Sequence, residues 1–218
     1  EAKTEFLQRM SHDIRTPING ICGMIDVADH YAEDMEKQTE CRTKIKEASH
    51  LLLELVNEVL DMSKLESEEV VLEEVPFDLS SISEEVLVVV EQMAAERNIR
   101  VTLEKKGILH RKLIGSPGHV KRVMMNILSN AVKYNKENGR IYMSCQELPS
   151  EQPDIATMEF ICRDTGIGMS EAFQERIFEP FAQEDSGSRT KYPGTGLGMP
   201  ITKKLIEKMG GTITFESK

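Results

Sequence analysis

Residues 7–31 read LQRMSHDIRTPINGICGMIDVADHY, and their apolar pattern indicates the fold of the first third of the chain. Counted in heptads from residue 7, apolar residues fall at positions a and d, which form one stripe along a helix that packs against a partner helix. The a positions hold Leu7, Ile14, Ile21 and Ala28, and the d positions hold Met10, Pro17, Met24 and Tyr31.

A second heptad pattern follows a polar stretch at 33–40. It has Ile45, Leu52 and Val59 at a, and Ala48, Leu55 and Met62 at d. Two apolar stripes joined by a short polar loop predict a helical hairpin. A lone hairpin leaves apolar surface exposed, so we expect two copies to pair as a four-helix bundle in a homodimer. A hairpin packed on its own C-terminal domain is the weaker interpretation.

After Glu66 the sequence becomes acidic and reaches Pro76, so we expect a hairpin domain at 1–67 and a second domain at 68–218. In the second domain, a capping box at Ser81 and Glu84 predicts the start of a helix. Further helices are expected at 117–135 and from near Gly196 to 209, and strands at 70–72, 99–103, 141–147, 155–163 and 212–215. This order predicts an α+β fold, a two-layer sandwich with helices on one face of a mixed sheet.

Charge and composition exclude several classes of protein. The 218 residues include 37 acidic and 27 basic side chains, a net charge of -10 that disfavours nucleic-acid or anionic-membrane binding. No apolar run approaches the ~18 residues of a membrane span, and the four cysteines show no zinc-site spacing. We therefore expect a cytoplasmic fragment without membrane contact, and the sequence leaves open whether a parent protein is membrane-anchored.

His12 occupies heptad position f, which faces away from the predicted helix seam, and Asp13 follows it directly. A carboxylate near Nδ1 would fix the imidazole tautomer and leave Nε2 as a nucleophilic lone pair. Pro17 lacks an N–H, so the carbonyl of Asp13 loses its helical partner and a kink is expected there. The plainer alternative is a solvated surface histidine.

The predicted helix at 117–135 carries a polar stripe. Asn126, Asn130, Lys133 and Tyr134 fall within about one quadrant of the helix, while Met124, Leu128 and Ala131 lie opposite and are expected to pack on the sheet. Amide oxygens suit Mg²⁺, lysine suits phosphate, and an aromatic ring suits a nucleobase. The alternative is an ordinary polar surface.

Two glycine motifs follow, and each alone is weak. The first, Asp164-Thr-Gly166-Ile-Gly168, offers a carboxylate that can accept a hydrogen bond from an adenine amino group. The second, from Gly194 to Gly198, opens a helix and could bind an anion through backbone N–H groups. The long connection at 170–193 is typical of a lid or a disordered segment. Phe178 and Phe181 either anchor its base or simply pack in the core.

Taken together, these stretches resemble the catalytic core of a sensor histidine kinase of two-component signalling. Residues 11–17 resemble its H box, 126–134 its N box, 164–168 its first glycine box, 178–181 its F box and 194–198 its second glycine box. The resemblance covers essentially the whole chain, and the five motifs stand in the family's order. It implies a dimerisation and phosphotransfer hairpin followed by a Bergerat-type ATP-binding domain.

By this resemblance, His12 takes the γ-phosphoryl group of ATP on Nε2, and Asp13 is its acid–base partner. Thr16 matches the position that, in related kinases, orients water for dephosphorylation of the response regulator. The implied cofactors are ATP and Mg²⁺, and the implied partner is the receiver domain of a response regulator, whose aspartate accepts the phosphoryl group.

The resemblance also implies the nucleotide contacts. Asn126 is the expected Mg²⁺ ligand and Asn130 a phosphate or metal contact. Lys133 would meet phosphate, Tyr134 would lie along the adenine, and Asp164 would receive the adenine amino group. The remaining cofactor-binding residues belong to the glycine boxes: Gly166, Gly168, Gly194, Thr195, Gly196, Leu197 and Gly198.

The chain departs from the family pattern in places. Ser116 and His119 stand where many relatives have Asp and Arg. Gln183 replaces a phosphate-contacting arginine of some relatives, for which Arg189 or Lys191 is a candidate substitute. Relatives continue past residue 218 through another glycine-rich turn and strand, so a C-terminally shortened ATP-binding domain is expected.

Two other functions remain open from the sequence. One is a different Bergerat-type ATPase, such as a topoisomerase or mismatch-repair relative, which would lack the H box. The other is a nucleotide-binding dimeric scaffold without kinase activity, which would tolerate loss of His12, Asn126 or Asp164.

Overall fold

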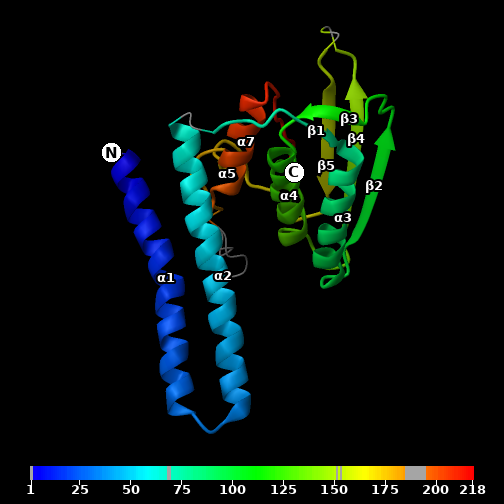
Figure 1. Cartoon of the computed structure of the whole chain (residues 1–218). Helices are drawn as coiled ribbons and strands as arrows, with labels where there is room; N and C mark the ends of the chain where they lie inside the picture. Colours follow the sequence, from blue (N-terminus) through cyan, green and yellow to red (C-terminus); the bar gives the residue numbers. More distant parts are fainter. Residues whose placement is uncertain (1, 68–69, 151, 153, 185–194) are drawn as a thin grey trace. The chain divides into compact units, whose positions relative to one another are not determined.

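The computed structural model describes residues 2–67, 70–150, 152, 154–184 and 195–218 (Figure 1). The chain divides into two compact units, 1–68 and 69–218. Among the described residues, no helix is both long and apolar enough to cross a bilayer.

The first unit is the predicted helical hairpin, formed by α1 (Ala2–His30) and α2 (Met35–Glu66) (Figure 1). From Met10 to Ala28 and from Ile45 to Met62, the side chains at the predicted a and d positions are buried or partly buried, and the most buried of them are Met10, Pro17, Leu55 and Met62. The prediction that Tyr31 lies in the seam is wrong. α1 ends at His30, and Tyr31 is about half exposed in the turn.

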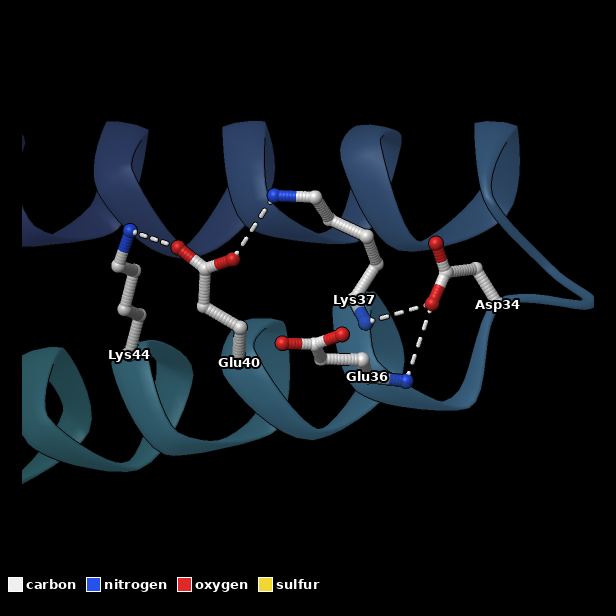
Figure 2. A network of polar contacts seen from close by, with 5 residues as sticks. All are labelled: Asp34, Glu36, Lys37, Glu40 and Lys44. Atoms are coloured by element: carbon white, nitrogen blue, oxygen red, sulfur yellow. Dashed lines mark hydrogen bonds and ion pairs between the residues drawn. The ribbon is translucent and has the colours of Figure 1, made fainter.

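The loop of the hairpin is shorter than the predicted polar stretch at 33–40, because α2 begins at Met35. Asp34 is the N-cap of α2, and its Oδ1 accepts hydrogen bonds from the backbone N–H of Glu36 at 3.0 Å and of Lys37 at 3.1 Å. Figure 2 shows this cap beside Glu40, whose carboxylate lies 2.6 Å from Lys44 Nζ and 3.0 Å from Lys37 Nζ. Chiefly through the bond from Lys44, the two ammonium groups lower the pKa of Glu40 to about 2.

The second unit contains a three-stranded sheet in the order β2 (Arg100–Lys106), β4 (Arg140–Leu148), β5 (Thr157–Asp164). β2 and β4 are parallel, whereas β4 and β5 are antiparallel, so the predicted mixed sheet is confirmed. Helices α3 (Leu79–Ala95) and α4 (Pro117–Lys133) supply most of the core against it. That core consists of Ile82, Val86, Val90, Ala94, Ile99, Met124, Leu128, Ala131, Val132, Ile141 and Met143.

The alternate side chains of the sheet are polar and bond across the strands. The Tyr142 hydroxyl donates to Glu104, and Gln146 Nε2 donates to Glu159 Oε2 at 2.5 Å. Because side chains alternate between the faces of a strand, the sheet has one apolar face against the helices and a second face that is mainly polar but includes Leu148 and Ile161. This arrangement is the predicted two-layer architecture.

The start of the second unit differs from the prediction. No strand forms at 70–72, and Val71 is 81% exposed. The strand is instead β1 (Val75–Asp78), because its antiparallel partner β3 (Lys112–Gly115), which the sequence did not predict, lies opposite those residues.

The predicted capping box at Ser81 is also wrong, since the N-cap is Asp78, three residues earlier, and α3 begins at Leu79. Asp78 Oδ1 caps it by accepting from the backbone N–H of Ser80 at 2.7 Å and of Ser81 at 3.4 Å.

The C-terminal part contains a short helix α5 (Glu171–Gln174) and the predicted helix α7 (Gly198–Lys208). The strand predicted at 212–215 does not form. The segment from 215 to 217 contacts a loop instead of pairing with a strand. The Met169 N–H donates to Ser217 Oγ at 2.9 Å, and the Phe215 ring lies edge-on to Phe178 with 5.7 Å between centroids.

Candidate functional site

His12 projects from α1 into solvent, with 79% of its side chain exposed. Its Nδ1 lies 3.0 Å from Asp13 Oδ1, as predicted. An ionised carboxylate only accepts hydrogen bonds, so Nδ1 carries the proton and the neutral ring keeps its lone pair on Nε2. The hairpin therefore displays a nucleophilic nitrogen whose tautomer is fixed by the next residue.

Thr16 lies one helical turn after His12, and both side chains are exposed. The Thr16 hydroxyl donates to the backbone carbonyl of His12 at 3.1 Å. Helix α1 continues through Pro17, which is buried, although proline leaves the carbonyl of Asp13 without its usual N–H partner. The structure thus keeps His12, Asp13 and Thr16 on one continuous helix.

The predicted polar stripe of α4 is present. Met124, Leu128 and Ala131 are buried in the core, while Asn126 and Asn130 are only partly buried. Asn126 Nδ2 donates to the carbonyl of Gly198 at 3.3 Å and to Thr202 Oγ1 at 3.1 Å. Among the described residues, nothing donates to Asn126 Oδ1. This oxygen therefore fits the part of a metal ligand.

Lys133 and Tyr134 lie together at the end of α4. The Lys133 Nζ lies over the Tyr134 ring, 5.1 Å from its centroid, in a cation–π contact. Burial raises the pKa of the Tyr134 hydroxyl above its ordinary value. The pair presents a cation and a partly buried aromatic ring on one surface. A cation suits phosphate, and an aromatic ring suits a nucleobase.

The first glycine motif is fastened to the end of α4. The N–H of Ile167 donates to the carbonyl of Tyr134 at 3.1 Å, and the N–H of Gly166 donates to Asp164 Oδ1 at 2.8 Å. A Cβ on Gly166 would lie 2.7 Å from that same carbonyl, so only glycine permits the approach. Asp164 and Tyr134, which are 30 residues apart, are thereby held close together.

The described part of the second glycine motif is a tight turn at the start of α7. Gly196 has φ +71°, and a Cβ there would lie 2.8 Å from the backbone of Phe181. Its carbonyl accepts from the Phe181 N–H at 3.0 Å, while the Leu197 N–H donates to Thr195 Oγ1 at 3.0 Å. Leu197 is fully buried. Gly194 and the candidate cations Arg189 and Lys191 lie outside the described residues.

Gly168 also has a left-handed backbone, with φ +71°, and a Cβ there would collide with the carbonyl of Lys218. The ring of Phe178 is partly exposed beneath Lys203 Nζ at 5.1 Å, whereas Phe181 is buried. The described part of the predicted lid, residues 170–184, therefore packs against the C-terminal segment and α7, and residues 185–193 lie outside the described part.

Several positioning residues carry no motif and were missed by the sequence analysis. The Arg97 guanidinium donates to the carbonyls of Val132 at 2.6 Å, Lys133 at 2.7 Å and Asn135 at 2.7 Å, which satisfies the C-terminal end of α4. Asn135 is fully buried, and its Oδ1 accepts from Thr165 Oγ1 at 3.1 Å. These bonds tie α4 to the first glycine motif.

The fully buried Thr202, which contacts Asn126, was missed as well. Thr202 gave one sequence signal, a hydroxyl directly after the apolar Pro200 and Ile201, whereas Arg97 and Asn135 stand among polar residues and gave none. The described residues contain no group of three or more His, Cys, Asp or Glu that could hold a metal by themselves. A metal here would have to share its ligands with a bound substrate, which is how Mg²⁺ is usually held beside nucleotide phosphates.

Two family models match the chain. Residues 2–68 match the His Kinase A (phospho-acceptor) domain, and residues 115–218 match the histidine kinase-, DNA gyrase B- and HSP90-like ATPase domain. Among curated proteins, the signal transduction histidine-protein kinase BarA of Escherichia coli K12 is 36% identical over 216 residues. The match covers 99% of this chain but only 23% of BarA.

Solved structures of histidine kinases are also similar to this chain. Full-length ShkA in complex with AMPPNP is 28% identical with a TM-score of 0.67, covering 94% of this chain and 41% of that one. The histidine kinase ThkA in complex with the response regulator protein TrrA is 26% identical with a TM-score of 0.69, covering 95% of this chain and 55% of that one.

Proposed function

The chain belongs to the sensor histidine kinase family, and on that premise we propose that it is an ATP-dependent protein-histidine kinase that phosphorylates its own His12. The observation that carries the proposal is the 3.0 Å contact between Asp13 Oδ1 and Nδ1 of an exposed histidine. This contact leaves Nε2 free to attack phosphorus.

The reaction transfers one phosphoryl group. The Nε2 lone pair attacks the γ-phosphorus of ATP, the bond to the β–γ bridging oxygen breaks, and ADP leaves. Positive charge develops on the imidazole, and Asp13 stabilises it and accepts the Nδ1 proton. The protein acts mainly by positioning groups and neutralising charge, as is usual in phosphoryl transfer.

The nucleotide is assigned to the second unit. Asp164 receives the adenine amino group on the oxygen that the Gly166 N–H does not use. Tyr134 lies along the base and Lys133 meets phosphate, with Asn130 as a further phosphate or metal contact. The two glycine motifs, 166–168 and 194–198, are the remaining proposed nucleotide contacts.

Mg²⁺ fits the donor set at Asn126. The Oδ1 of Asn126 faces away from the two acceptors of its Nδ2 and accepts no hydrogen bond from the described residues. When bound, the ion would neutralise charge on the phosphate oxygens. We propose Asn126 as its protein ligand.

The partners follow from the hairpin. The phosphoryl group passes from Nε2 of His12 to an aspartate on the receiver domain of a response regulator. Thr16 orients the water that later hydrolyses this aspartyl phosphate to inorganic phosphate. ThkA, to which this chain is similar, was solved with a response regulator. Exposed apolar side chains on the hairpin, at Ile18, Ile25, Leu53, Val56 and Leu60, support pairing of two copies.

The test is labelling with γ-³²P-ATP and Mg²⁺. We expect label that is labile to acid and stable to base, as a phosphoramidate is, and we expect its loss in His12→Gln. His50→Gln makes the same chemical change at another exposed histidine of the hairpin, and it should label like the wild type. Equal labelling of His12→Gln would refute the assignment, and an unlabelled wild type that still binds ATP would favour the scaffold.

A further inference from the structure

Thr202 is a buried hydroxyl to which the proposed chemistry gives no part. It lies in the second turn of α7, is fully buried, and has the buried residues Pro200, Ile201 and Leu205 on the same helix. A hydroxyl in such a setting requires a hydrogen-bond partner. Its partner is Asn126 Nδ2, 3.1 Å away on α4, which packs against α7 (Figure 1).

Thr202 and the first turn of α7 together determine which way the Asn126 amide faces. The carbonyl of Gly198 can only accept, so the atom 3.3 Å from it must be the amide nitrogen and not the amide oxygen. That nitrogen has two protons, and the Gly198 carbonyl and Thr202 Oγ1 accept one each. Oδ1 is then forced to the opposite side, where the described residues offer it no donor.

From this geometry we infer that Thr202 is a positioning residue for the metal: it holds the Asn126 amide so that Oδ1 is presented to Mg²⁺. The inference rests on the proposed function, since it concerns the ion that accompanies ATP. It also gives α7 a function. This helix, which follows the second glycine motif, orients the metal ligand Asn126 on α4. Partners that orient a metal ligand typically affect metal affinity by about 10–100-fold.

The test compares Thr202→Val, which keeps the shape and removes the acceptor, with Thr202→Ser, which keeps it. A fluorescent ADP analogue is titrated by anisotropy in Mg²⁺ and in EDTA. We expect Thr202→Val to weaken nucleotide binding about 10-fold or more in Mg²⁺ and to leave binding in EDTA unchanged, while Thr202→Ser behaves like the wild type. Thr157→Val, the same change at an exposed position of β5, controls for the substitution itself.

A second readout needs no nucleotide. The Asn126 side-chain NH₂ signals in a ¹H–¹⁵N spectrum, assigned by their absence in Asn126→Asp, should move upfield in Thr202→Val as one proton loses its acceptor. Unmoved signals would overturn the inference, as would an equal loss of binding in Mg²⁺ and EDTA or wild-type affinity in both. Failure of the proposed function looks different, since the wild type itself would then bind nucleotide without any effect of Mg²⁺.

Discussion

At the residue scale, the proposed phosphate acceptor and the proposed adenine contact are each oriented by a neighbour in sequence. Asp13 holds Nδ1 of His12, and the N–H of Gly166 holds one oxygen of Asp164. Such short-range relations can be predicted from sequence, because adjacent residues on a helix or in a tight turn stay close in any fold. The contacts of Arg97 and Thr202 could not be predicted, since they join residues that only the tertiary structure brings together.

The role of Asp164 can be tested by binding. Asp164→Asn keeps the size of the side chain but removes the charge that strengthens a hydrogen bond to the adenine amino group. We expect ADP affinity, measured by calorimetry, to fall about 10-fold, which corresponds to the ~1.5 kcal/mol lower bound for a bond to a charged group. Asp154→Asn, an exposed acid in a loop, should bind like the wild type. Unchanged affinity in Asp164→Asn would rule out the assigned contact.

At the element scale, long periodic segments were predictable and short ones were not. α4 and β4 carry enough turns or alternations for their buried faces to be recognised. β1 and β3 have four residues each, and their pairing, rather than their composition, determines where they lie. The cap of α3 was misassigned because Asp78 and Ser81 are both good caps, and the pairing of Asp78 in β1 selects the earlier one.

The turn at the start of α7 requires glycine. In Gly196→Ala, the left-handed backbone alone costs about 1–2 kcal/mol, and contact with Phe181 adds to it. Gly118→Ala, in the first turn of α4 with open space around it, should instead stabilise by about 0.5–1 kcal/mol. Urea denaturation measures both. A Gly196→Ala protein as stable as Gly118→Ala would contradict the turn geometry.

The salt-bridge network near the hairpin loop predicts a pH dependence (Figure 2). The folded-state pKa of Glu40 is about 2, below its ordinary 4.5, so its contribution to stability is complete above pH 4.5 and is lost as the pH falls toward 2. Glu40→Gln should therefore have a lower melting temperature than the wild type at pH 7 in low salt. This difference should fade at pH 2. It should also fade in 1 M NaCl, because that is about ten times the salt concentration that gives a Debye length of ~10 Å, so the charges are strongly screened. Thermal scans in which the gap persists at pH 2 would disprove the network's role.

At the scale of the whole molecule, function was predictable because five weak motifs occur in one order, although none of them suffices alone.

The hairpin's exposed apolar residues predict a homodimer. Ile25→Glu should shift sedimentation toward the monomer, whereas Val88→Glu, an equally apolar and more exposed site on α3, should not. A dimer that withstands Ile25→Glu, and equally Leu53→Glu, would place the interface elsewhere.

The phosphoryl group is expected to end on one particular nitrogen. After reaction with ATP and Mg²⁺, ¹⁵N–³¹P NMR of the chain labelled at histidine measures this directly. We predict a single phosphohistidine at His12 with phosphorus on Nε2, because Asp13 occupies Nδ1. Phosphorus on Nδ1, or on any other residue, would contradict it.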